Sequence, residues 1–287
     1  MKNSKPIKKS IIAISILICS VTMLAVVPIV FSPSNTAYAA SNDVIYYADN
    51  GEYSQETETI TYATKDTSPL FRVNNTFPAY YNMNDALTNA CANVAGANLI
   101  GYYDRYFENL IPDFVPGIKR GSNYNYYPMT TNATKVQALI EDLYIRMGTN
   151  STNIGTSQTD YKNGITSYVN SKGRNVSYSS VMTGGSLDIN KVQQSINNGT
   201  PVSLYLSGYN IVTLSDNSSS ASLTKYLYTG DHIMIVYGYQ TIDYFDGNHN
   251  LIKSNTYLYV ATGTTRSGYY LLNNNGTIND AESVHIS

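Results

Sequence analysis

Two side chains of this sequence have the chemistry that nucleophilic catalysis needs, the thiol of Cys91 and the imidazole of His232. A Cys thiolate attacks a carbonyl carbon, and a nearby His accepts the thiol proton and later protonates the leaving group. The thiol precedes the imidazole by about 140 residues. A Cys followed by a distant His is the general arrangement of a Cys/His nucleophile and base pair. These two residues are therefore the first candidates for a catalytic site.

The residues around Cys91 predict the start of a helix. Asn89 is a good N-cap residue two positions before Cys91, so the thiol is expected in the first helical turn. The N-terminus of a helix carries partial positive charge, which stabilises a thiolate and lowers its pKa. The alternative interpretation is a buried structural thiol, because free Cys is one of the most buried residue types.

Of the three histidines, His232 is the best placed to act as a base. It begins the most apolar predicted strand, residues 233–239, which is hydrophobic on both faces as expected of a central strand. His249 lies in a segment with the composition of a hairpin turn, and His285 is two residues from the C-terminus. A lone His beside a strand is more often a packing residue, so the interpretation of His232 depends on Cys91.

The helix that carries Cys91 is expected to be central and buried. Apolar residues recur at steps of three and four and stop before Pro112. The first half of the helix is rich in Ala and Gly, and each interior Gly costs about 1 kcal/mol relative to Ala, which indicates close packing of neighbours. The recurring residues are Ala95, Leu99, Tyr102, Tyr106 and Leu110.

The other predicted elements change from helices to strands along the chain. Further helices are expected at residues 135–147, at 157–172, and from 186 or 188 to 198. Predicted strands follow at residues 202–206, 209–214, 233–239, 256–261, 269–272 and 283–286. Helices followed by strands favour an α+β domain with segregated halves.

Residues 1–39 have the pattern of a secretory signal. Four Lys precede an apolar run from residue 11 to 31, and Ala37-Tyr38-Ala39 forms an A-x-A cleavage site. The run is long enough to span a bilayer, so an uncleaved membrane anchor is the alternative. Cleavage would remove Cys19 and leave a secreted chain with one thiol.

Composition limits the partners of the chain. Its 287 residues include 18 basic and 20 acidic ones, and loss of the four signal lysines would lower the formal charge from −2 to −6. Such a balance is untypical of nucleic-acid binders, which carry clustered basic surfaces. Residues 243–250 lack the spacing and the bidentate Glu of an EF-hand, so a hairpin turn is expected there, and no metal or cofactor is predicted.

These segments together resemble the papain-like cysteine peptidases, especially secreted bacterial ones similar to streptopain and the double-glycine leader peptidases. Residues 89–103 look like that family's nucleophile helix, residues 230–239 look like its His strand, and residues 196–202 are similar to the turn before its first long strand. The resemblance covers residues 78–287. Residues 40–77 are polar and are expected to be an N-terminal extension with short strands, or a short propeptide.

The resemblance implies a papain-like α+β fold. In this fold an N-terminal helical half carries the Cys helix and packs against a C-terminal antiparallel β-sheet or half-barrel that carries the His. Carried over residue by residue, it implies Cys91 as the nucleophile and His232 as its base. The family's oxyanion donor, a Gln shortly before the Cys, is absent here, and Asn84 is the expected substitute, assisted by the backbone N–H of Cys91.

A second departure concerns the group that orients the imidazole. The family has an Asn or Asp at the position where this chain has Ala261. Alanine cannot hold an imidazole tautomer. Either Thr262 or a main-chain carbonyl replaces it, or the orienting group comes from elsewhere, or the protein is a weak or inactive relative.

The sequence therefore predicts a secreted cysteine peptidase that cleaves peptide or protein substrates through an acyl-enzyme intermediate. One alternative is a Cys/His cell-wall peptidase or transpeptidase, which would differ in loops such as residues 112–132 and 209–228. Another is a non-catalytic surface or binding module with the papain fold, which Ala261 favours. No nucleic-acid partner is expected, and contact with a membrane would come only through an uncleaved signal.

Overall fold

The computed structural model describes residues 45–46, 53–74, 76–114, 129–272 and 277–287 of the chain. These residues belong to one compact unit, Asn42–Ser287. The predicted signal at residues 1–39 lies outside the described residues, as does most of the loop predicted at 112–132. Among the helices that the structure describes, none has the length and hydropathy needed to cross a membrane.

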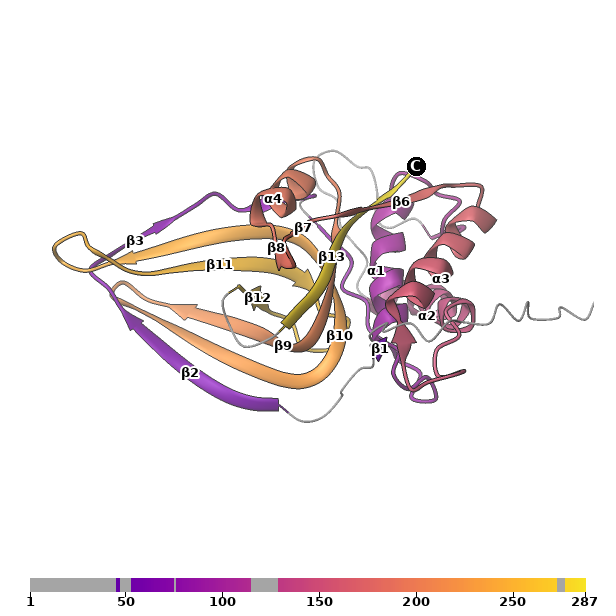
Figure 1. Cartoon of the computed structure of the whole chain (residues 1–287), viewed down its shortest axis with the longest axis horizontal. Coiled ribbons are helices and arrows are strands. Elements are labelled where there is room, and N and C mark those ends of the chain that lie inside the picture. Colours follow the sequence, from indigo (N-terminus) through magenta and orange to yellow (C-terminus); the bar gives the residue numbers. More distant parts are fainter. Residues whose placement is uncertain (1–44, 47–52, 75, 115–128, 273–276) are drawn as a thin grey trace, which may run out of the picture. The chain divides into compact units, whose positions relative to one another are not determined.

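A nine-stranded antiparallel sheet dominates the described residues (Figure 1). Its strands are β2 (Tyr53–Thr61), β3 (Thr64–Thr67), β4 (Phe71–Arg72), β6 (Val176–Ser180), β9 (Val202–Asp216), β10 (Ser220–Phe245), β11 (Leu251–Ala261), β12 (Tyr269–Leu271) and β13 (Thr277–Ile286). Their order is β2-β10-β11-β12-β9-β13-β6, and β3, β4 and β9 also pair with β10. Because β10 pairs with both β9 and β11, while β12 joins those two, the four strands close on one another. Two small sheets pair β1 (Ile45–Tyr46) with β5 (Thr156–Ser157) and β7 (Met182–Thr183) with β8 (Ser186–Leu187).

The expected papain-like α+β fold with a helical half is wrong. Strands make up 43% of the described residues and helices 24%. The strands predicted at 202–206 and 209–214 are one strand, β9, which passes through Gly208 at a φ of +70°. β10 extends far beyond the predicted residues 233–239, because its more polar first half also pairs with neighbours on both sides.

Residues before position 78 supply three further strands of the sheet. All nine residues of β2 pair with the first half of β10, and β3 and β4 pair with its second half. The ring of Phe71 in β4 stacks on that of Tyr239 in β10, with 5.0 Å between centroids. Within the predicted extension, residues 40–77, the strands β2, β3 and β4 are therefore paired into the main sheet along β10, whereas β1 pairs with β5.

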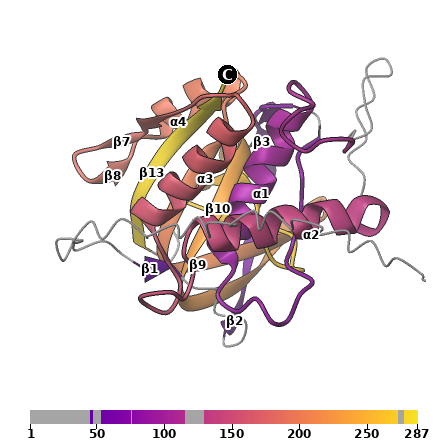
Figure 2. The ribbon, with the colours of Figure 1, turned by 90° about the vertical axis from the view of Figure 1, so that its right-hand side faces the viewer.

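Three helices pack together against one side of the strands (Figure 2). Their apolar side chains share a core with Tyr205 of β9, Ile233 and Ile235 of β10, and Val284 of β13. The fourth helix contributes Val192 and Ile196 to a second core with other residues of β9 and β10. The described helices are α1 (Cys91–Asp104), α2 (Met129–Arg146), α3 (Gln158–Ser171) and α4 (Ile189–Asn197).

Every residue of α1 is buried, which confirms the central position predicted from its small residues, but the helix ends at Asp104 and does not include the predicted Tyr106 and Leu110. A Cβ added at Gly101 would lie 2.6 Å from the ring of Tyr80, and one at Gly96 would lie 3.2 Å from Met147. Neighbours therefore approach α1 to distances that only glycine permits without movement. This packing fixes the position of Cys91, its first residue.

Candidate active site

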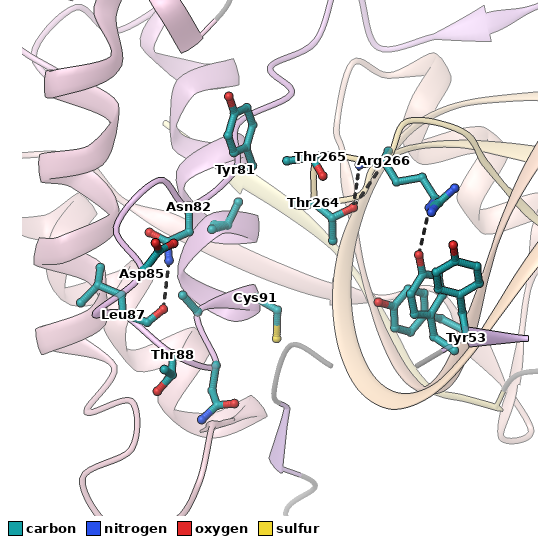
Figure 3. A pocket seen from close by; sticks show the side chains of 16 residues that line it. Tyr53, Tyr81, Asn82, Asp85, Leu87, Thr88, Cys91, Thr264, Thr265 and Arg266 are labelled. Carbon is teal, nitrogen blue, oxygen red and sulfur yellow. Dashed lines mark hydrogen bonds between the residues drawn. The ribbon is translucent and has the colours of Figure 1, made fainter. Parts of the chain in front are cut away.

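A cavity of about 570 Å³ lies beside the first turn of α1. One wall comes from the segment 81–91 that leads into α1, and the opposite wall comes from the tyrosines of three strands and the loop 263–266. Figure 3 shows Cys91 between Asp85, Leu87 and Thr88 on one side and Tyr53 and Arg266 on the other. The tyrosines are Tyr53 of β2, Tyr209 of β9 and Tyr228 of β10.

Cys91 starts α1, but the predicted cap is displaced. The N-cap residue is Ala90, which makes no side-chain cap hydrogen bond. Asn89 has a φ of +58°, and its side-chain amide donates to Asn150 Oδ1 at 3.0 Å instead. The first N–H groups of α1 therefore lack a capping side chain and lie at the cavity wall.

Burial controls the ionisation of Cys91. The residue is 2% exposed, and desolvation is the largest cause that raises the pKa of its thiol, to about 12. The backbone N–H groups of Ile233 and Ala92 act to lower this pKa, while the charge of Asp231 raises it further. The lowering expected from a helix N-terminus is thus outweighed, and the thiol is neutral in the resting protein.

The imidazole of His232 is completely buried and held in one orientation. Its Nε2 lies 2.7 Å from the carbonyl oxygen of Thr262. Because a carbonyl only accepts, Nε2 carries the proton in this pair, which leaves the lone pair on Nδ1. Nδ1 has no hydrogen-bond partner among the described residues. Burial lowers the pKa of His232 to about 4, so the imidazole is neutral and Nδ1 is available as a base.

Helix α1 and strand β10 bring Cys91 and His232 onto neighbouring elements. Ile233, which follows His232, has its N–H close enough to the thiol to lower the thiol pKa, and it shares a core with Cys91. No hydrogen bond joins Sγ to Nδ1 within the described residues. The two candidates therefore lie on packed elements, one residue from a shared backbone contact, and they are not hydrogen-bonded to each other in the resting protein.

The group that orients His232 is a main-chain carbonyl, one of the alternatives that the sequence left open. Ala261 is buried at the end of β11, and the carbonyl of the next residue, Thr262, accepts the imidazole N–H. The hydroxyl of Thr262 donates to the carbonyl of Arg266 at 2.7 Å, which ties the following loop to this position. A main-chain carbonyl leaves no residue-type signal, so sequence reasoning could not assign the role.

Stacked tyrosines cover the imidazole, and sequence reasoning missed them. The ring of Tyr209 lies 4.4 Å from that of His232 at an interplanar angle of 20°, and Tyr228 stacks on Tyr209 at 4.4 Å and 4°. Both tyrosines line the cavity, and Tyr209 covers one face of the imidazole. With 28 tyrosines spread along the chain, residue type alone did not single out these two.

Asn84, the predicted oxyanion donor, does not line the cavity. Its amide nitrogen donates to Glu141 at 3.0 Å, and its Oδ1 accepts from the N–H of Ala86 at 3.1 Å. Asn82 does line the cavity, but its amide nitrogen donates to the carbonyls of Asn84 and Leu87, both at 2.9 Å. The geometry therefore does not support an oxyanion role for Asn84, whereas the backbone at the start of α1 does lie at the cavity wall.

The other two histidines take the places expected of them. His249 is exposed at a φ of +62° in the turn between β10 and β11, where Asp246 Oδ1 accepts from the N–H groups of Asn248 and Asn250. This arrangement confirms the predicted hairpin turn. His285 is exposed on β13, and neither histidine lines the cavity.

A second cavity of about 340 Å³ adjoins the first. The two share Tyr81 and residues 263–266 in their walls. Phe77 and Tyr237, whose rings stack at 4.9 Å, line the second cavity on the far side of this loop. The two spaces together offer a longer binding surface than a compact small molecule needs.

Comparison of the sequence with protein-family models and with curated proteins finds no match. Function is therefore inferred from the residues and geometry of the cavity.

Proposed function

We propose that the protein is a secreted cysteine peptidase in which Cys91 is the nucleophile and His232 the general base. One observation carries this proposal: the Nε2–H of His232 is held by the Thr262 carbonyl, which leaves Nδ1 unpartnered beside the strand segment that contacts the Cys91 thiol. An unpartnered, completely buried nitrogen is costly, so its retention one residue before the backbone N–H that contacts the thiol supports a chemical role.

In the proposed reaction both groups start neutral. As Cys91 Sγ bonds to the substrate carbonyl carbon, its proton passes to Nδ1 of His232, and the carbonyl of Thr262 stabilises the resulting imidazolium through Nε2–H. The oxyanion accepts from the first N–H groups of α1. The imidazolium then gives its proton to the leaving nitrogen as the C–N bond breaks. Water, deprotonated by Nδ1, hydrolyses the thioester and the thiol recovers a proton.

The choice of a peptide as substrate rests on two features. The segments around Cys91 and His232 resemble those of cysteine peptidases, although the fold of the whole chain differs from the one that the resemblance implied. The two adjoining cavities, of about 570 and 340 Å³, fit an extended chain that crosses the loop 263–266 beside Cys91. The predicted signal at residues 1–39 supports action outside the cell.

Hydrolysis assays with matched variants test the proposal. Purified protein is incubated with casein and, separately, with peptidoglycan, beside the variants Cys91→Ala, His232→Gln and His285→Gln. We expect casein cleavage that is abolished in Cys91→Ala and reduced roughly a hundredfold or more in His232→Gln. His285→Gln is the control, because this exposed imidazole lies outside the cavity and its loss leaves the rate unchanged. Cleavage of peptidoglycan alone would favour the cell-wall peptidase or transpeptidase.

A non-catalytic binding module is the second candidate, and the state of the thiol favours it. Cys91 is nearly inaccessible, its pKa is about 12, and it makes no hydrogen bond with His232 Nδ1. A module of this kind would bind casein or peptidoglycan equally well in the wild type and in Cys91→Ala, with no turnover of either. Turnover lost in Cys91→Ala would exclude it.

A further inference from the structure

Arg266 presents a positive charge at the wall of the cavity in an aromatic frame. Its guanidinium carbon lies 3.8 Å from the ring centroid of Tyr226 and 4.8 Å from that of Tyr53. Its Nε donates to the hydroxyl of Tyr228 at 3.1 Å. These three tyrosines come from β2 and β10, so two paired strands hold the side chain in place.

This guanidinium has no anionic partner within the described part of the chain. Neither terminal nitrogen of Arg266 takes part in a hydrogen bond or ion pair with a described residue. An Arg side chain is always charged, and its planar fork matches a carboxylate through two parallel hydrogen bonds. The guanidinium of this partly exposed side chain, with both terminal nitrogens unused, can therefore accept an anion.

The nearest alternative is that an acidic residue of the cavity itself neutralises Arg266. Asp85 is the acidic residue in the cavity wall, but it belongs to the segment that leads into α1 and makes no ion pair with Arg266. In Figure 3 Asp85 and Arg266 lie on opposite sides of Cys91. The two charges therefore lie on opposite sides of the thiol, and no ion pair joins Arg266 to a carboxylate of the described residues.

We propose that Arg266 binds a carboxylate of the substrate and thereby selects anionic peptides. The carboxylate is either an acidic side chain or a free C-terminus, and both chemistries fit the same guanidinium fork. This inference rests on the proposed peptidase function, since it places the carboxylate relative to a bond that Cys91 attacks. Tyr53 and Tyr226 hold the guanidinium by packing, so only its terminal nitrogens are left for the ligand.

Paired peptides separate the two sources of the carboxylate. In one pair, C-terminally amidated peptides differ only by Glu or Gln on either side of the cleaved bond. In the other, Gln-containing peptides carry either a free or an amidated C-terminus. Hydrolysis is measured with the wild type, Arg266→Gln and Arg266→Lys. Binding of the same peptides, carrying a fluorescent label, is measured with Cys91→Ala and with the double variant that combines Cys91→Ala and Arg266→Gln. Arg72→Gln is the matched control, because Arg72 packs on Tyr259 and does not line the cavity.

We expect one pair to show a preference for the carboxylate of roughly tenfold to a hundredfold in kcat/KM, as a charge-assisted hydrogen bond would give. Arg266→Gln abolishes this preference, Arg266→Lys keeps part of it, and Arg72→Gln leaves it intact. The pair that responds identifies the source.

Two results would overturn the carboxylate site while the peptidase proposal stands. One is an equal rate of hydrolysis for the two peptides of each pair, and the other is a loss of rate in Arg266→Gln that is the same for both peptides of a pair. Carboxylate-dependent binding without hydrolysis would support the site and reject the peptidase. Neither binding nor hydrolysis would reject both.

Discussion

The neutral imidazole of His232 sets the pH range in which it can accept a proton. Because burial lowers its pKa to about 4, it becomes protonated only in strongly acidic solution. We therefore expect kcat/KM to stay constant as the pH falls from neutrality to about 5 and then to decline with a midpoint near pH 4. The measurement is the pH profile of peptide hydrolysis, with circular dichroism at each pH to confirm that the protein stays folded.

The control for this profile is His249→Gln, which removes an exposed imidazole from a turn outside the cavity and leaves the midpoint unchanged. A midpoint near the ordinary His value of about 6.5 would contradict the prediction, because it would mean that burial does not lower the pKa of His232 in the working protein.

Asp104 predicts a second effect of pH, this time on stability. It is 2% exposed in α1, Oδ1 accepts from the N–H of Ile111 at 2.7 Å, and Oδ2 has no partner among the described residues. Burial raises its pKa from 3.8 to about 8. Since the folded pKa lies above the unfolded one, the contribution of this carboxyl to stability is complete below pH 3.8 and is lost as the pH rises through 8.

The variant Asp104→Asn removes this ionisation. We expect the free energy of unfolding of the variant to rise relative to the wild type between pH 4 and pH 8, by at most about 1.4 kcal/mol per pH unit, and the difference to level off above pH 8. Urea denaturation at a series of pH values measures it. The exposed Asp66→Asn serves as the control, and a difference for Asp104→Asn that is independent of pH would contradict the assignment.

The sequence led to Cys91 and His232 because few residues of their types are present to choose from. It did not predict that the Cys91 thiol is neutral. A sequence can indicate where a helix begins, and so where its dipole acts, but the burial of the thiol depends on elements from distant parts of the chain. The same limit applies to Arg266 and Tyr209. Their importance comes from which rings they touch, and these contacts join β9, β10 and the loop after β11.

Helices were predicted better than strands, because the residues that start and end a helix lie close together in the sequence. Helix α4 is capped by Asp188, which accepts from the N–H groups of Asn190 and Lys191, as the sequence suggested. Helix signals of this kind lie within one or two turns. Strand β10, in contrast, spans 26 residues, and its polar first half is stabilised by pairing with β2 and β9 rather than by its own composition.

The contact between β4 and β10 depends on a glycine. A Cβ added at Gly238 would lie 2.6 Å from the backbone oxygen of Phe71, so β4 would have to move away. We expect Gly238→Ala to destabilise the protein by roughly 1–3 kcal/mol, measured as a lower urea midpoint, and to make the segment before Pro78 more susceptible to proteolysis. The control is Gly247→Ala in the turn between β10 and β11, where an added Cβ meets nothing within 4 Å. Equal midpoints for the two variants would contradict the role assigned to Gly238.

On the scale of the whole molecule, the described part of the predicted extension is integral to the fold. Residues 53–72 supply β2, β3 and β4, and Ile60 and Tyr62 are buried in a core with Leu223 of β10. Tyr53 of β2 also lines the cavity and contacts Arg266. A peptidase with a removable propeptide keeps its sheet and site after cleavage, and this chain would lose parts of both.

Two chains of different length test this consequence. A chain that begins at Ala40, after the predicted signal, is expected to unfold cooperatively and to retain activity, since the compact unit starts at Asn42. A chain that begins at Pro78 would leave one edge of β10 unpaired, and exposed strand edges promote aggregation, so we expect it to be insoluble or unfolded. Circular dichroism and size-exclusion chromatography measure the difference between the two chains. A soluble, active chain from Pro78 would show that residues 40–77 are dispensable, because β10 would then be stable without β2, β3 and β4.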